Sequence, residues 1–311
     1  MKKIILLVLL IFFTGCSSYT DINNIAVTSS IGIDFKANNY LVYFNILSSN
    51  TLNEKEVYKE VCNDLDKCFE RLNNTISKKL YLTHLDLLVL SNSLDKNNIT
   101  EVIDFFLNQK SSRNSFSVIV LDKITEDFFN YDSKDINNML ELSIDNNGLV
   151  KKITLDDIVK DILNYDISYV PYLENNEKIE IIGYKSIYSA NKILSNLDSI
   201  SINLIMNNIR NFSIVVDNIT YNLEECNTIN KFNSHGIDIN VSCKCNIESN
   251  GSVIKIKNHL NTIINNFISN NSNNYLKYLY YKYKNKKRDD LKYKVNVSIV
   301  ELEDKGGISF E

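Results

Sequence analysis

Residues 31–47 read IGIDFKANNYLVYFNIL, and this stretch predicts a β-hairpin near the start of the chain. Apolar and polar side chains alternate over residues 31–36 and again over residues 40–47, which is typical of strands. Ala37, Asn38 and Asn39 lie between the two runs and predict the turn, because asparagine tolerates the positive φ angles that tight turns require. An antiparallel sheet is therefore the first expectation for the fold.

The stretch that follows predicts the longest helix. Between residues 54 and 79, apolar side chains recur every three or four positions, which places them on one face of a helix of about six to seven turns. These positions are Val57, Val61, Leu65, Cys68, Leu72 and Ile76. This periodicity is the clearest secondary-structure signal in the chain.

Further strands and helices mix without a repeating order. Strand patterns occur at residues 85–90, 116–121, 179–188 and 236–247, and helical patterns at 99–108, 155–163 and 256–268. Residues 212–224 predict a second hairpin that turns at Asp217 and Asn218. Because no strand–helix–strand rhythm runs along the chain, an α+β fold with largely antiparallel sheets and packed helices is favoured over a doubly wound α/β fold.

The length of 311 residues predicts two domains, because domains average about 150 residues. Residues 174–178 read ENNEK and are the best candidate for a linker, since the segment is polar and charged throughout. We therefore expect one mixed domain over residues 16–173 and a second over residues 179–311. Residues 1–15 belong to neither domain.

Residues 1–16 have the features of a lipoprotein signal peptide. Lys2 and Lys3 precede an apolar run at positions 4–13, which would rise only about 15 Å as a helix, against roughly 30 Å for the hydrocarbon core of a membrane. The ending FTGC resembles a lipobox, so Cys16 is predicted to carry a diacylglycerol and to become the mature N-terminus. The alternative is an ordinary secretory signal with an incidental cysteine.

Composition excludes two classes of function. The chain has eight glycines and no Gly-x-Gly pair, which excludes the glycine-rich loops that bind nucleotide phosphates. The formal net charge of -4 argues against nucleic acid as the main partner, since a nucleic-acid-binding domain usually carries a net basic face. No cofactor is expected.

Five cysteines follow the signal segment, and this odd number leaves at least one thiol unpaired: Cys62, Cys68, Cys226, Cys243 and Cys245. Cys243 and Cys245 are two residues apart in an alternating run, so they share one strand face. Thiols that face the core are the favoured interpretation, with a disulfide and a zinc site as alternatives. The spacing matches no zinc-finger or zinc-ribbon pattern.

The sequence predicts no catalytic or metal-binding residues. His84, His235 and His259 belong to no recognisable nucleophile motif, and neither GxSxG nor HExxH occurs. The pair Asp156-Asp157 offers two carboxylates for acid–base chemistry, but it follows Thr154 at the start of a predicted helix, where carboxylates complement the helix dipole. A helix-end role is therefore the expectation.

Residues 275–288 form the most polarised stretch, with five tyrosines, six lysines or arginines and no acidic residue. The favoured interpretation is an amphipathic helix that lays Leu276, Leu279 and Tyr283 on the core of its own domain and exposes a basic face. Contact with anionic lipid and contact with a partner protein are the alternatives. The candidate contact residues are Lys277, Tyr278, Tyr281, Lys282, Lys286, Lys287 and Arg288.

Several segments, taken in order, resemble one known family. DINNIAVTSSIGID at residues 21–34 follows the lipobox cysteine, LYLTHLDLLVL lies at residues 80–90, and IDFF lies at residues 103–106. LDDI at residues 155–158 then precedes PYL at residues 171–173 and IIG at residues 181–183. The order and spacing resemble the Ger(x)C spore germination proteins over nearly the whole mature chain, although the tryptophan that this family usually has next to the lipid-bearing cysteine is absent.

The resemblance implies a non-enzymatic protein. Ger(x)C proteins are the lipoprotein C subunits of nutrient germinant receptors and act with two integral membrane subunits in the inner membrane of the spore. This would place the chain on the outer face of that membrane, anchored through the diacylglycerol on Cys16. Its expected role is the assembly and coupling of the receptor in germination.

Two other classes of protein are alternatives. A lipid-anchored solute-binding protein would need two βαβ lobes around a cleft, and the predicted antiparallel hairpins do not favour it. A cell-wall hydrolase is favoured less, because no hydrolase motif occurs in the sequence.

Overall fold

The computed structural model describes residues 25–47, 55–76, 78–109, 112–188, 191–206, 209, 211–234, 236–247, 251–270, 274–284 and 291–302. The predicted signal peptide, Cys16, His235 and the basic residues Lys286, Lys287 and Arg288 lie outside the described residues. Tyr278 and Lys282 lie on a helix, but their side chains are not among the described ones.

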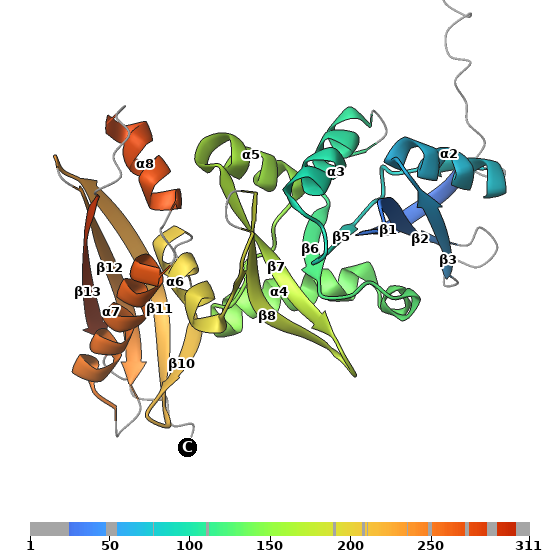
Figure 1. The fold of residues 1–311 in the computed structure, drawn as a ribbon. Helices are drawn as coiled ribbons and strands as arrows, with labels where there is room; N and C mark the ends of the chain where they lie inside the picture. The colour runs from blue at the N-terminus through green and yellow to red at the C-terminus, as the bar shows by residue number, and fades with distance from the viewer. Residues whose placement is uncertain are drawn as a thin grey trace, which may run out of the picture.

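Among the described residues, the larger of two sheets has nine strands, and most of them are labelled in Figure 1. Its strands are β1 (Ile25–Lys36), β2 (Asn39–Leu47), β3 (Lys55–Cys62), β4 (Lys79–Tyr81), β5 (Leu87–Ser91), β6 (Ser117–Leu121), β7 (Ile167–Asn175), β8 (Ile179–Tyr188) and β9 (Ile193–Leu194). Their order is β3-β2-β1-β5-β6-β7-β8-β9, and β4 pairs with the start of β1. The centre from β1 to β7 is parallel and the flanks are antiparallel. The prediction of largely antiparallel sheets is therefore only partly right.

The central strands of the large sheet are parallel because helices connect them along the chain. β5 and β6 are each five residues long and buried throughout, and helix α3 (Lys96–Asn108) returns the chain from one to the start of the other. Helix α4 (Ser133–Asn147), which the sequence did not indicate, lies between β6 and β7 in the chain. The apolar runs predict strands, but their direction depends on these crossover helices.

The smaller sheet has four strands in chain order, β10 (Phe212–Val216), β11 (Ile219–Phe232), β12 (Gly236–Ile247) and β13 (Lys292–Glu301). β10, β11 and β12 are antiparallel, and β13 pairs parallel with β12. The predicted turn is confirmed, because Asp217 and Asn218 have φ angles of 52° and 63°, in the left-handed region that a tight hairpin turn requires.

Helices cover both sheets, so the predicted α+β class is confirmed. α2 (Leu65–Ile76), α3 and α5 (Leu155–Tyr165) close the core on one face of the large sheet. α4 and the 3₁₀ helix η2 (Glu126–Asn130) contribute to the core on the other face (Figure 1). α7 (Val253–Asn270) and α8 (Asn274–Lys284) pack against the small sheet.

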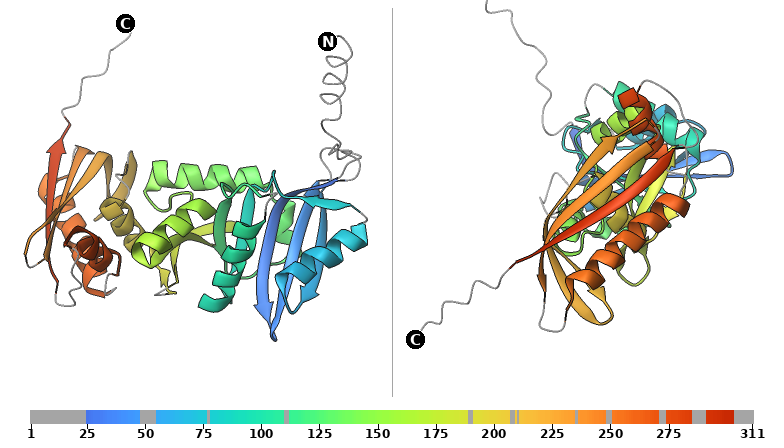
Figure 2. Two further views of the ribbon diagram at one scale, coloured as in Figure 1. Left: turned by 90° about the horizontal axis from the view of Figure 1, so that it is seen from above. Right: turned by 90° about the vertical axis from the view of Figure 1, so that its left-hand side faces the viewer.

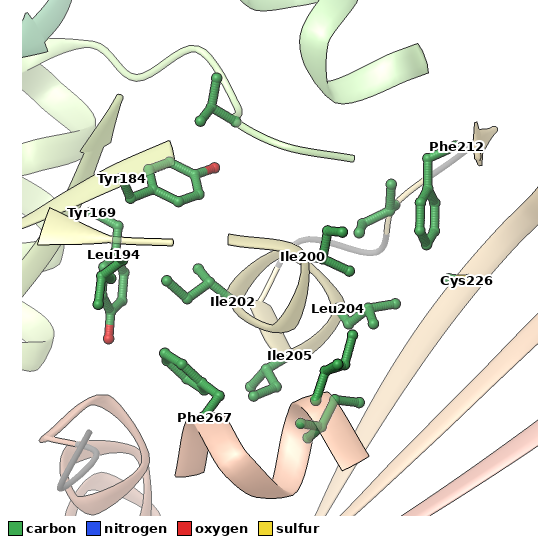
Figure 3. Close-up of a cluster of buried hydrophobic side chains, with 14 of the residues drawn as sticks. Tyr169, Tyr184, Leu194, Ile200, Ile202, Leu204, Ile205, Phe212, Cys226 and Phe267 are labelled. Carbon is green, nitrogen blue, oxygen red and sulfur yellow. The ribbon is translucent and has the colours of Figure 1, made fainter. Parts of the chain in front are cut away.

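Helix α6 (Asn196–Met206) lies between the two sheets and joins their cores (Figure 3). Seven consecutive residues from Ser199 to Ile205 are buried, which is typical of a helix surrounded by protein. One apolar cluster extends from Val89 in the large sheet through Ile202 to Val241 in the small sheet. The two sheets therefore form one elongated body with a shared core (Figure 2).

The segment predicted as a linker lies inside the large sheet. Glu174 and Asn175 are the last residues of β7, and residues 176–178 connect it to β8. The two strands pair from Ile167 opposite Tyr188 to Asn175 opposite Ile179. The segment is thus the turn of a β-hairpin, and the boundary expected there does not separate the two sheets. Turns and linkers are both polar because both lie at the surface, so composition alone does not distinguish them.

The predicted helix over residues 54–79 is wrong in its first part. Residues Lys55–Cys62 form β3, which pairs with β2 along its whole length, and α2 begins only at Leu65. The four-residue spacing of Val57 and Val61 fits a helix face. Four is also twice the strand period, so the same spacing fits one face of a strand, and pairing with β2 decides between the two.

Two disulfides replace the expected core-facing thiols. Cys62 is bonded to Cys68 and Cys226 to Cys243, whereas Cys245 is free and buried. The first pair forms because the chain turns between β3 and α2; in one continuous helix, residues six apart would point about 120° away from each other. The second pair forms at a β-bulge in β11 that sets Cys226 near Cys243, with Cα atoms 4.1 Å apart.

Candidate functional site

Helix α8 carries the basic stretch that the sequence singles out. It packs against α5 and β12, and Leu276 and Tyr280 on its inner side are buried. The hydroxyl of Tyr280 donates to the backbone oxygens of Asn233 and Ser234, at 3.4 and 3.3 Å, and so ties the helix to the loop between β11 and β12. The expected amphipathic helix is present, with Tyr280 rather than Tyr283 on the core side.

The outer side of α8 is aromatic and basic. Tyr281 and Tyr283 are exposed, and Lys277 and Lys284 are half-buried. Tyr283 stacks on Phe232 of β11 with ring centres 4.5 Å apart, and Lys284 Nζ lies 5.0 Å from the centre of the Tyr283 ring. These contacts hold aromatic rings and a cation together at the surface.

The neighbouring helix α5 extends this surface. α5 and α8 lie on the same side of the molecule (Figure 1), and Leu163 of α5 is 81% exposed. We define the α5–α8 surface by its exposed and half-buried members, Lys160, Leu163, Lys277, Tyr281, Tyr283 and Lys284. Exposed leucine and tyrosine side chains together with lysines suit contact with lipid headgroups or with the groove of a protein partner.

The segment Gly32-Ile33-Asp34, which contributes to the family resemblance, has a structural role. A Cβ at Gly32 would lie 2.6 Å from Cζ of Phe129, so η2 packs directly on this strand. Asp34 is buried, accepts a hydrogen bond from Ser93 Oγ and lies 2.6 Å from Lys36 Nζ. The carboxylate thus ties the end of β1 to the loop that follows β5.

The other candidate residues lie apart from one another. His84 is exposed beside Tyr81, and His259 is half-buried on α7, where burial lowers the pKa of its imidazole. Within the described part of the chain, no group of three histidine, cysteine or acidic side chains is placed to hold a metal. Asp157 accepts hydrogen bonds from the backbone N–H and the hydroxyl of Thr154, which confirms its predicted helix-end role.

No helix in the described ranges combines the length and the apolar character needed to cross a membrane.

Comparison with known proteins gives one family match. The sequence matches the family model described as the spore germination protein N-terminal domain over residues 18–175, a range that contains strands β1 to β7. Among solved structures, the crystal structure of the GerBC protein aligns with a TM-score of 0.48 and 12% sequence identity, over 88% of this chain and 97% of that chain. No curated protein matches the sequence.

Proposed function

Because the chain belongs to the Ger(x)C family of spore germination proteins, we propose that it is the lipid-anchored C subunit of a nutrient germinant receptor. The observation that carries the proposal is the family match over residues 18–175, about half of the chain. The segments at residues 21–34, 80–90 and 103–106 that resemble the family lie within this range. In this role the protein acts with two integral membrane subunits in the inner membrane of the spore.

The proposed anchor is a diacylglycerol on Cys16, attached when the signal peptide at residues 1–15 is removed. Two acyl chains suffice for stable attachment, since each buried CH₂ contributes about 0.8 kcal/mol. The nine residue steps from Cys16 to Ile25, where β1 begins, reach at most about 30 Å when fully extended. The anchor would therefore hold the large sheet close to the outer face of the membrane.

The proposed contribution to the receptor is assembly and coupling, without catalysis. The shared core around α6 supports this role, because a body with one core presents surfaces in a fixed relation to each other. The proposed contact region is the α5–α8 surface, together with Tyr278, Lys282, Lys286, Lys287 and Arg288 of the same basic stretch. Its lysines suit anionic headgroups, and its exposed rings suit the interfacial zone of a membrane or a partner groove.

The variant Cys16→Ala tests the anchor in spores. We expect this variant in the soluble fraction, and we expect the spores to lose their response to nutrients, because an untethered subunit no longer assembles with its membrane partners. Fractionation and nutrient-triggered release of dipicolinate measure the two effects, with Ser18→Ala as the control that retains the cysteine. Normal germination with a fully soluble variant contradicts the proposal.

The two alternative functions have less support. A solute-binding protein needs two βαβ lobes, whereas β10, β11 and β12 of the small sheet form an antiparallel meander. A cell-wall hydrolase has no observation in its favour.

A further inference from the structure

An open groove lies between helix α4 and the first half of β8, and we call it the α4–β8 groove. Its volume is about 630 Å³. The α4 residues that line it extend from Asp135 to Asn146, which corresponds to about 16 Å along the helix axis. About five residues of an extended chain span the same length, since each residue rises about 3.3 Å. The groove therefore has the length of a short extended segment.

Several apolar side chains line the α4–β8 groove. Met139 of α4 and Leu149, which follows α4, lie beside it together with Ile181 of β8. These three side chains are half-buried, whereas Leu142, which also lines the groove, is 58% exposed. A partner that covers the groove would remove apolar surface from water, and this removal favours binding.

The groove reaches a strand edge that lacks a neighbour. β9 pairs with β8 only at Tyr184 and Lys185, in the second half of the strand. Among the described residues, no strand pairs with positions 179–182 on the side away from β7. The first half of β8 is therefore an open edge of the large sheet.

The backbone groups at this edge point outward. On β7, Leu173 O accepts from Asp122 N at 3.2 Å, and Asn175 N donates to Asp122 Oδ1 at 3.1 Å, so both residues direct their backbone groups toward β6. Leu173 is opposite Ile181, and Asn175 is opposite Ile179. In an antiparallel pair of this kind, the groups of the two opposite residues point away from each other. The N–H and C=O groups of Ile179 and Ile181 are therefore directed away from β7, where a further strand would bind them.

The opposite edge of the sheet has features that discourage pairing. β3 forms that edge and carries two lysines and two glutamates in eight residues. Arg71 of α2 also donates to Val61 O of β3 at 2.8 Å. Residues 179–182 of β8 read IEII instead, and β-branched isoleucines favour strand pairing. An open apolar edge of this kind is typical of a site at which another chain adds a strand.

The charge of the groove indicates the kind of chain. Asp135 of α4 and Glu180 of β8 line the groove and are exposed, and no basic residue of the described chain lines it. A second copy of this protein bound through the same groove would bring these acids close to their counterparts, because such an interface uses the same surface twice. Like charges at an interface are unfavourable, whereas basic side chains complement the two acids.

We propose that the α4–β8 groove binds an extended basic segment of a partner protein, which adds a strand to the edge of β8. The backbone of this segment exchanges hydrogen bonds with Ile179 and Ile181, and its alternate side chains lie on Met139 and Leu142. Its lysines or arginines lie beside the two acids of the groove. This surface is separate from the α5–α8 surface, and its binding is measured without germination.

The probe is a fluorescently labelled pentapeptide, Lys-Ile-Lys-Ile-Lys with blocked ends, added to the full mature chain in phosphatidylcholine nanodiscs. Fluorescence anisotropy measures the binding. We expect saturation in the millimolar range or below, because a peptide of this size makes few contacts. The peptide Glu-Ile-Glu-Ile-Glu is the matched control, and we expect it not to bind.

Methylation of the peptide nitrogens tests the strand geometry. Alternate residues of an added strand direct their N–H groups toward β8, and the residues between them direct theirs to solvent. One peptide is methylated at the isoleucine nitrogens and another at the lysine nitrogens. We expect one of the two to bind about tenfold more weakly and the other to bind as before, since only one loses its hydrogen bonds to β8. Equal affinities of the two methylated peptides would overturn the proposal and would favour a helix or side-chain contacts alone.

A double variant tests the place of binding. We expect Asp135→Lys with Glu180→Lys to weaken binding of the lysine peptide about tenfold or more, because both acids of the groove are reversed. Asp104→Lys with Asp145→Lys is the matched control, since these acids are exposed, lie outside the groove and change the net charge equally. Circular dichroism shows that both variants are folded before they are compared.

Three further outcomes would overturn the proposal. The first is equal binding of the lysine peptide to the two double variants. The second is no saturable binding of this peptide up to the millimolar range. The third is a dimer of the protein, detected by sedimentation, that the lysine peptide dissociates, because the groove would then belong to a second copy.

Discussion

Asp34 is a buried carboxylate at the end of β1 whose ionisation depends on its neighbours. Burial opposes the charge, but hydrogen bonds from Lys36, Ser93 and Ser91 together hold the pKa of this carboxyl below its ordinary value. A carboxyl group whose pKa is lower in the folded protein than in the unfolded chain stabilises the fold. For Asp34 this contribution is present above the pKa of the unfolded chain, near 3.8. That contribution is lost as the pH falls through the folded value.

We expect Asp34→Asn to lower the free energy of unfolding at pH 7 by about 2 kcal/mol, because the neutral amide loses charge-assisted hydrogen bonds in a buried place. The difference from the unmodified protein should shrink as the pH falls below 3.8. Urea denaturation between pH 7 and pH 3 measures both effects, with the exposed Asp104→Asn as control. A difference that stays constant with pH would contradict this assignment.

Some residue roles follow from local spacing and others do not. Thr154 and Asp157 are three residues apart, so the sequence alone predicts their capping interaction. Met139 and Ile181 line one groove because α4 lies beside β8. Nothing in the spacing of these two residues indicates that they meet, and the groove was therefore beyond sequence reasoning.

Secondary-structure elements were predictable where a single local pattern decides them. The β1–β2 hairpin, the buried strands β5 and β6 and helix α7 all agree with the sequence pattern. Helix α6 was missed because it is buried on all sides and so has no amphipathic stripe. β3 was predicted as helix because its apolar spacing fits both periods, and only its pairing with β2 distinguishes them.

The two disulfides link neighbouring elements, and their pairing determines how many free thiols the protein should have. Cys62–Cys68 joins β3 to α2, and Cys226–Cys243 joins β11 to β12, which leaves Cys245 free. Titration of the unfolded, unreduced mature chain should detect one thiol, and the reduced control should detect all five. The folded protein should react slowly, because Cys245 is buried and burial raises the pKa of its thiol to about 11. Three or more thiols without reductant would contradict the pairing.

We expect the lysines of α8 to strengthen binding to anionic membranes. In the Cys16→Ala background, which removes the lipid, we expect the double change Lys277→Glu and Lys284→Glu to weaken binding to anionic vesicles about tenfold or more, since each lysine near such a surface contributes about 1 kcal/mol. Co-sedimentation measures the binding, and Lys294→Glu on β13 is the matched control. If the double variant and the control bind equally, the α5–α8 surface is not a lipid contact.

At the scale of the whole molecule, length predicts two domains, and one apolar cluster connects the two sheets. The apolar cluster passes from the large sheet through α6 to the small sheet, and the expected linker is the turn of the β7–β8 hairpin. The sequence shows where polar segments lie. Whether the two sheets share a core depends on the packing of α6, because both sheets bury this helix. Helix α6 therefore connects the cores of the two sheets.

We propose that this Ger(x)C protein works as an anchored subunit of a germinant receptor. The most direct test is to isolate the affinity-tagged chain from detergent-solubilised inner membranes of dormant spores and to identify the proteins that copurify with it. We expect two integral membrane subunits to be recovered in comparable amounts, and we expect Cys16→Ala to abolish their recovery. Recovery of the chain alone from the membrane, or only from the soluble fraction of the spore, would contradict it.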